Sequence, residues 1–168
     1  MPEDFELTPQ PVAWPLLFRY RGPVLGKGYV AVVELHGRLL ARPAEGGGVW
    51  LDGVNPGALA LGAPTIQAAR KELNSALTGV FVDFAAEADS FDAFKAQVER
   101  FFQDTDAGSV AEWQACVAEV QSGRITSPGL LPVLKASSPL LVTVIRKSAD
   151  AVTPQDNPES EPVLASVA

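Results

Sequence analysis

The chain has 168 residues, a formal net charge of −7 and 47% hydrophobic residues, which fits one domain with a substantial core. The excess of acidic residues argues against the basic surface with which nucleic-acid-binding domains hold phosphates, so we expect no direct binding of nucleic acid. The single cysteine, Cys116, excludes an internal disulfide, and no apolar run approaches the ~20 residues of a membrane helix, so we expect a cytoplasmic protein without membrane contact.

The first predicted strands lie between residues 16 and 41. Apolar and polar residues alternate over residues 16–21, which indicates a strand with one polar face. Residues 29–35 are rich in Val and predict a core strand. Two continuations stay open: a hairpin turn at His36 and Gly37 into a strand over residues 38–41, or one long strand with a bulge.

Glycine and proline divide the next segment into short pieces. Pro and three glycines over residues 43–48 predict a break, and residues 49–51 predict a short strand. Residues 55–57, Asn-Pro-Gly, predict a turn because Pro fixes φ and Gly accepts a positive φ. Residues 58–61 form the third extended run.

A long helix is predicted from the N-cap residue Thr65 to about residue 85. Apolar residues recur there at steps of three and four, the period of one helix face; they are Ile66, Ala69, Leu73, Ala76, Leu77, Val80 and Phe84. Gly79 weakens the helix by ~1 kcal/mol relative to Ala. We expect it to permit the close approach of another backbone.

Two further helices follow. The first begins at Ser90, and Phe91, Phe94, Val98 and Phe101 make up its apolar face. The second is predicted to begin at Ser109, because Ser109 and Glu112 have the spacing of a capping box. Ser122 and Gly123 end this helix.

The end of the chain returns to extended structure. Residues 128–132 form a proline-bracketed connector, and residues 140–145 predict a strong strand. We expect one α+β domain over residues 1–147, with a helical insertion at about 87–126 and the helices packed on one face of a small, mainly antiparallel sheet. Residues 148–168 carry four acidic residues and no Lys or Arg, which predicts a disordered acidic tail.

Residues 28–85 together resemble the HicB-like antitoxin family. The pieces that carry the resemblance are the strand from Tyr29, Gly46-Gly47-Gly48-Val49-Trp50-Leu51, Asn55-Pro56-Gly57-Ala58, and the helix start Gly62-Ala63-Pro64-Thr65. A connector at residues 128–132 and a strand at 141–145 repeat the end of the pattern more weakly. The chain departs from the family in about forty extra residues, 87–126, and in the lack of a basic DNA-binding segment after Ile145.

The resemblance implies a partial ribonuclease-H-like sheet, with one long core helix, that binds and blocks a small basic ribonuclease toxin without being a nuclease itself. The resemblance also implies that such a protein needs no cofactor and no metal. The alternative is a stand-alone regulatory or scaffolding oligomer of the same fold, with no toxin partner. Exposed strand edges, together with the family habit, predict a homo-oligomer.

Candidate partner-binding residues are Glu87, Asp89, Asp92, Glu99 and Trp50. Between Glu87 and Glu119 there are eight Asp and Glu against Lys95 and Arg100, and such a block suits a basic partner. The alternative is that these carboxylates are the solvated faces of two helices. Trp50 and Trp113 are possible interface anchors, although we expect core packing for both.

No catalytic site is expected. A nuclease would need Glu34, Asp52, Asp83 and Glu87 to converge on metal ions, whereas we expect Asp52 in a turn and Asp83 and Glu87 on a solvent face. His36 is expected to be a surface residue at a turn rather than a general base. Cys116 is expected to be a small buried thiol.

The glycine run and the few metal-binding side chains predict no cofactor site. Residues 46–48 lack a following Lys-Ser/Thr and do not open a helix, so they do not form a phosphate loop. One His and one Cys leave too few ligands for a Cys/His zinc site within the chain.

Overall fold

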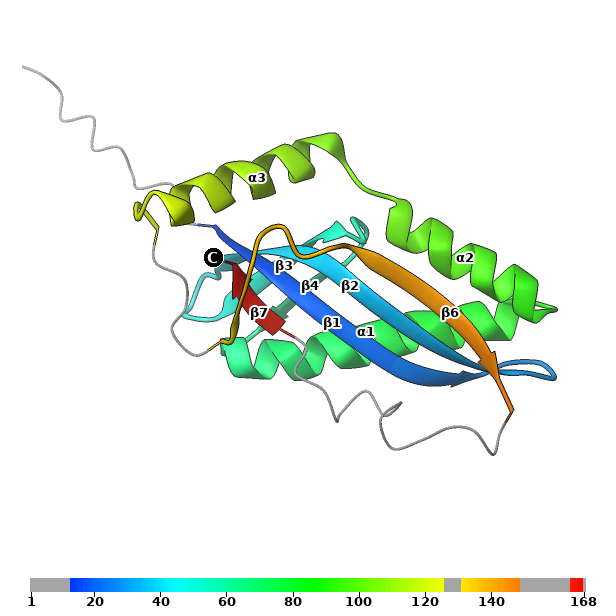
Figure 1. Ribbon diagram of the computed structural model, residues 1–168. Coiled ribbons are helices and arrows are strands. Elements are labelled where there is room, and N and C mark those ends of the chain that lie inside the picture. Colours follow the sequence, from blue (N-terminus) through cyan, green and yellow to red (C-terminus); the bar gives the residue numbers. More distant parts are fainter. Residues whose placement is uncertain (1–12, 126–130, 149–163, 168) are drawn as a thin grey trace, which may run out of the picture.

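The computed structural model describes residues 13–125, 131–148 and 164–167, and within these ranges the chain forms seven strands of one sheet and three helices (Figure 1). The strands are β1 (Trp14–Leu25), β2 (Val30–Pro43), β3 (Val49–Asn55), β4 (Ala60–Ala63), β5 (Val133–Leu134), β6 (Leu141–Lys147) and β7 (Leu164–Val167). The helices are α1 (Ile66–Glu87), α2 (Phe91–Gln103) and α3 (Ala107–Gln121). The α+β class expected from the sequence is confirmed.

β2 is the central strand, because it pairs with three others. The strand order is β4-β3-β2-β1-β7-β5, and β6 also pairs with β2. On one side β2 pairs with β1 along most of its length; on the other, residues 38–43 pair with β3 and residues 30–36 pair with β6. These pairs are antiparallel, and among the described strands the β5–β7 pair is parallel. β3 and β6 therefore share one edge of β2.

The prediction of a turn at His36 and Gly37 is wrong, and the alternative of one long strand with a bulge is right. Both residues lie inside β2, where Gly37 is opposite Phe18 of β1. The pairing of β2 with β3 shifts register between Arg38 and Leu39. The hairpin that the sequence suggested there instead joins β1 to β2, and the amide of Gly26 donates to the carbonyl of Tyr29 at 2.9 Å.

Side chains alternate between the two faces of the sheet, and helices cover both of them. On one face Leu16 and Phe18 of β1 pack in a large cluster with Leu77 and Phe81 of α1 and Phe94 of α2. On the other face a smaller cluster holds Ala13, Leu17, Leu40, Val54, Trp113, Val117 and Val167, so α3 packs there. The expectation of helices on a single face is therefore corrected: α3 crosses to the opposite side (Figure 1).

The helix caps decide where each helix begins. Thr65 caps α1, its hydroxyl accepting from the amide of Ala68 at 3.0 Å, and Ser90 caps α2 in the same way at 3.1 Å. The predicted start of the third helix is wrong, because Asp106 caps α3 through the amide of Ser109 at 3.0 Å. Gly79 of α1 has no neighbouring atom within 4 Å of a Cβ built on it, so no backbone of the described residues packs there.

The α2–α3 linker passes from one face of the sheet to the other beside the turn after β3. The amide of Gly57 donates to the carbonyl of Asp104 at 2.8 Å, and the hydroxyl of Thr105 donates to the carbonyl of Val54. Phe94 of α2 and Trp113 of α3 are buried in the two core clusters. The segment predicted as an insertion thus contributes to both cores.

The last described strand corrects the prediction of a disordered tail. Residues 164–167 form β7, whose Leu164 and Val167 are buried and which pairs with β1 and β5. The rest of the predicted tail, residues 149–163 and 168, and part of the connector, residues 128–130, lie outside the described residues. No helix in the described part of the chain is long and apolar enough to cross a membrane.

Candidate protein-interaction surfaces

An acidic surface forms where α1 ends and α2 begins. Glu87 is the last residue of α1, Asp89 lies in the connection, and Asp92 lies in the first turn of α2, all three exposed. Asp89 is 3.5 Å from the ammonium of Lys27, but its side chain is 95% exposed, so the pair leaves the carboxylate open to solvent. Connectivity thus brings these three predicted residues together.

Glu99 extends this surface along α2. It follows Asp92 by seven residues, so the two share one helix face about 10 Å apart along the axis. Lys95 lies between them on the same face, and Glu99 itself is half-buried. We call Glu87, Asp89, Asp92 and Glu99 the acidic surface.

Trp50 does not belong to the acidic surface. It is on β3 opposite Arg42, whereas Lys27, the partner of Asp89, lies in the hairpin beyond the other end of β2; the 12 residues between Val30 and Arg42 span about 40 Å. Trp50 is 42% exposed, so the expectation of core packing is wrong for it. Its indole N–H donates to Asp52 at 2.8 Å, and its ring lies against Gly62 of β4.

Charge is divided between the strands and the helices. Residues of β1, β2, β6 and the β1–β2 hairpin include seven basic side chains and one acidic side chain, Glu34; the basic ones are Arg19, Arg21, Lys27, Arg38, Arg42, Arg146 and Lys147. Residues 66–121, which span the helices, include ten Asp and Glu against four Lys and Arg. Among the described residues the negative charge is therefore concentrated on the helices, and the acidic block at residues 87–119 was its sign in the sequence.

The four carboxylates of the nuclease hypothesis do not converge. Asp83 and Glu87 lie on α1, on the face opposite to the side chain of Glu34. Asp52 lies in β3 rather than in the expected turn, opposite Leu40, and six residues along β2 separate Leu40 from Glu34, about 20 Å. Within the described ranges no group of three His, Cys, Asp or Glu is arranged to hold a metal ion.

Glu34 instead links two basic residues on the open part of the sheet. Its carboxylate is 2.7 Å from the guanidinium of Arg21 and 3.1 Å from Nε2 of His36. His36 is thus a half-buried strand residue, which corrects the expectation of a surface turn. All three side chains are about a quarter to a third exposed, so the Arg21–Glu34 ion pair is partly screened and its contribution to stability is modest.

Further along the same face, arginines join β2 to β3 and α3. Arg38 donates to the side-chain oxygen of Asn55 at 2.8 Å, and its guanidinium lies 5.0 Å from the ring centre of Trp113. Arg42 lies 2.5 Å from Glu112 of α3 and 3.5 Å from Asp52. The sequence analysis did not predict this line of polar side chains along β2. The alternation of polar residues at 34, 36, 38 and 42 indicated that they share one face of a strand.

Trp113 and Cys116 of α3 have structural positions. Trp113 is 4% exposed and its indole N–H donates to the carbonyl of Leu16 at 3.3 Å, so its predicted core role is confirmed. Cys116 packs at the margin of the same cluster and is only partly buried, less than the sequence suggested. Burial, with the nearby Glu112 carboxylate, raises the pKa of the Cys116 thiol, which disfavours the nucleophilic thiolate.

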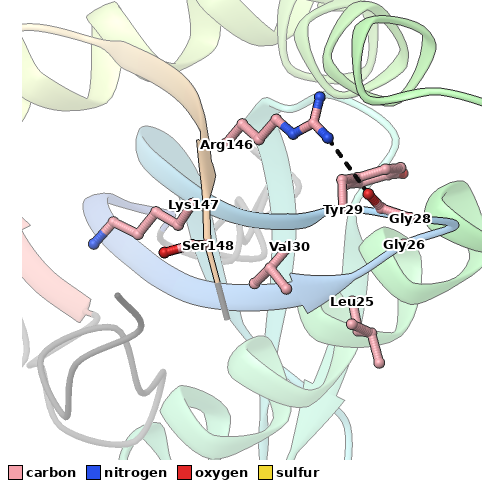
Figure 2. A pocket seen from close by; sticks show the side chains of 8 residues that line it. All are labelled: Leu25, Gly26, Gly28, Tyr29, Val30, Arg146, Lys147 and Ser148. Carbon is pink, nitrogen blue, oxygen red and sulfur yellow. Dashed lines mark hydrogen bonds between the residues drawn. The ribbon is translucent and has the colours of Figure 1, made fainter. Parts of the chain in front are cut away.

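A shallow pocket of about 610 Å³ lies at the end of the β1–β2 hairpin (Figure 2). Its described lining is Leu25, Gly26, Gly28, Tyr29, Val30, Arg146, Lys147 and Ser148. Figure 2 shows Arg146 and Lys147 pointing to opposite sides of β6, and Arg146 donates to the carbonyl of Gly28 at 3.4 Å. This lining contains neither a carboxylate nor a histidine, so it does not supply the paired acid and base of a catalytic site.

No family model, no curated protein and no solved structure matches the chain.

Proposed function

We propose that the chain is a non-enzymatic protein-binding module whose acidic surface receives a small basic protein. The observation that carries this proposal is the exposed carboxylate group of Glu87, Asp89 and Asp92 at the α1–α2 junction, on a helical segment with ten acidic and four basic residues. Complementary charge raises the association rate and selects partners of opposite sign.

The partner's class follows from the resemblance to HicB-like antitoxins. Such a protein would bind a small basic ribonuclease toxin and neutralise it by occupying its cationic RNA-binding face. The acidic helices offer a surface of the required sign. The separated carboxylates Glu34, Asp52 and Asp83 fit a protein that binds another protein and does not itself cleave RNA. A single thiol, Cys116, suits the reducing cytoplasm, where we place this activity.

The test compares two double variants with the same change in net charge. Glu87→Lys/Asp89→Lys alters the acidic surface, and Glu45→Lys/Glu72→Lys alters exposed carboxylates away from it, in the β2–β3 turn and the first half of α1. A tagged chain is used to recover a small basic protein from the native host, and the affinity of the purified pair is measured by biolayer interferometry at two salt concentrations. We expect the first variant to weaken binding about tenfold or more, a loss of about 1.4 kcal/mol, and the control to change it far less.

Two outcomes would contradict the proposal. Equal weakening by both double variants would mean that net charge, not the acidic surface, governs binding. Recovery of the chain without a basic protein, under conditions in which the tagged chain is folded, would remove the toxin partner altogether.

The second candidate function is a stand-alone regulatory or scaffolding oligomer of the same fold. The observation that favours it is that β6, a seven-residue strand, pairs with one strand, β2, among the described residues. A stable homo-oligomer that captures no basic partner would support this candidate over the first.

A further inference from the structure

Several strand edges of the sheet have no partner among the described residues. They lie on β4, β5, β6 and the second half of β1, since β7 pairs only with residues 16–18 of β1. An unpaired edge offers a row of amide and carbonyl groups to another chain, and proteins usually protect such edges. The four edges differ in this protection.

Three of the edges are poor templates for pairing. β5 has two residues and β4 has four, including Gly62. The part of β1 that follows residue 18 contains Pro23, which has no amide hydrogen to donate, and carries the charged Arg19 and Arg21. Short length, proline and charge are the features that discourage a second strand.

β6 has none of these features over residues 141–145. It contains four consecutive β-branched residues, from Val142 to Ile145, and neither glycine nor proline. Leu141 and Ile145 lie on the same face of the sheet as α3, in a part that α3 does not cover, and are 37% and 43% exposed. Its charges, Arg146 and Lys147, come after this stretch, and Figure 1 shows β6 at the margin of the sheet.

The sequence of β6 is self-complementary when two copies run antiparallel about Thr143. In that register Thr143 meets Thr143, Val142 meets Val144, and Leu141 meets Ile145 of the other copy. Each residue keeps its own face, because partners differ by an even number of positions. Arg146 falls opposite Leu140 and Lys147 opposite Pro139, so no like charges meet.

We propose that two copies of this chain pair through β6 about a two-fold axis at Thr143, which joins their sheets into one. The contact is isologous, since the same residues face each other from both sides, so it closes as a dimer. α2 packs beside β6 in each copy, so the axis also brings the two α2 helices near each other and enlarges the contact. The β6 edge itself contains no residue of the acidic surface, and the test of the β6 pairing does not depend on the basic partner.

The first experiment measures the mass of the full chain by light scattering at about 100 µM, a concentration well above a micromolar Kd. The native chain is expected at twice 17.7 kDa. Thr143→Lys places two ammonium groups on the axis and is expected to give monomers, whereas Ser75→Lys, on an exposed position of α1, is expected to leave the dimer intact. Circular dichroism spectra check that both variants are folded.

The second experiment tests the register through a disulfide. In a Cys116→Ala background, Thr143→Cys puts two thiols at opposed positions of an antiparallel pair, where Cα atoms lie about 4.5–5.5 Å apart and a disulfide can form. We expect a covalent dimer under mild oxidation, and none from Cys116→Ala/Ser75→Cys at the same concentration. A native chain that is monomeric at 100 µM would overturn the proposal, and so would a dimer that survives Thr143→Lys and forms no Thr143→Cys disulfide.

Discussion

Gly37 offers a test in which the sign of the effect separates two explanations. The residue lies inside β2 without a positive φ, so backbone conformation alone does not require glycine. On that ground Gly37→Ala would stabilise the protein by about 0.5–1 kcal/mol, because alanine loses less backbone entropy on folding. The tertiary structure predicts the opposite.

A Cβ at Gly37 would lie 2.2 Å from the backbone carbonyl oxygen of Asn55 and 2.3 Å from a ring carbon of Phe18. Ordinary contact begins at 3.4 Å, so backbone and ring would both have to move by more than flexible side-chain adjustment allows. Overpacking of this kind costs about 1–3 kcal/mol, and we expect a net loss of about 1–2 kcal/mol after the entropic gain.

Urea unfolding followed by circular dichroism measures this loss. With a slope of about 2 kcal/mol/M, the midpoint of Gly37→Ala is expected to fall by about 0.5–1 M. Gly79→Ala is the matched control. Apart from its chain neighbours and the backbone of helix α1 itself, no described atom lies within 4 Å of a Cβ built at this position, and we expect the substitution to raise stability by up to about 1 kcal/mol. A midpoint for Gly37→Ala equal to or above that of the native chain would refute the close approach of Phe18 and Asn55.

Three further predictions concern the core and the titrating groups. Phe81→Ala should destabilise by about 3–5 kcal/mol, because Phe81 is fully buried against Tyr20, whereas Val82→Ala, at an exposed position, should cost under about 0.5 kcal/mol in the same urea assay. Burial raises the pKa of Tyr20 above its unfolded value, so its contribution to stability is present below pH ~10 and is lost as the pH rises through the folded pKa. Tyr20→Phe should therefore flatten the alkaline fall in stability, at a cost of about 1 kcal/mol for the lost bond to Thr78; an unchanged alkaline slope would contradict this reasoning. Because burial raises the pKa of Cys116, iodoacetamide should alkylate it more slowly at pH 8 than in the urea-unfolded chain, and equal rates would argue against its packing on α3.

Local patterns in the sequence determined the elements that are stabilised by neighbours along the chain. The three- and four-residue spacing of α1 and its Thr65 cap, the β-branched strands, and the break at residues 43–48 depend on bonds and periodicities within a few residues. Local sequence also determined the main part of the acidic surface. Glu87, Asp89 and Asp92 lie within six residues of one another, and one helix–helix connection brings them together.

Tertiary contacts decided the rest, because they join segments that are far apart in the sequence. Gly37 continues a strand instead of forming a turn because β1 pairs with β2 and places Phe18 opposite it. α3 lies on the second face because Trp113 reaches the carbonyl of Leu16, 97 residues away. Residues 164–167 become β7 because β1 offers an edge at residues 16–18, and Trp50 stays exposed because no element of the described chain covers that part of β3. Each of these outcomes depends on contacts between segments that are far apart in the sequence. The local spacing of residue types does not specify which distant segments pack together.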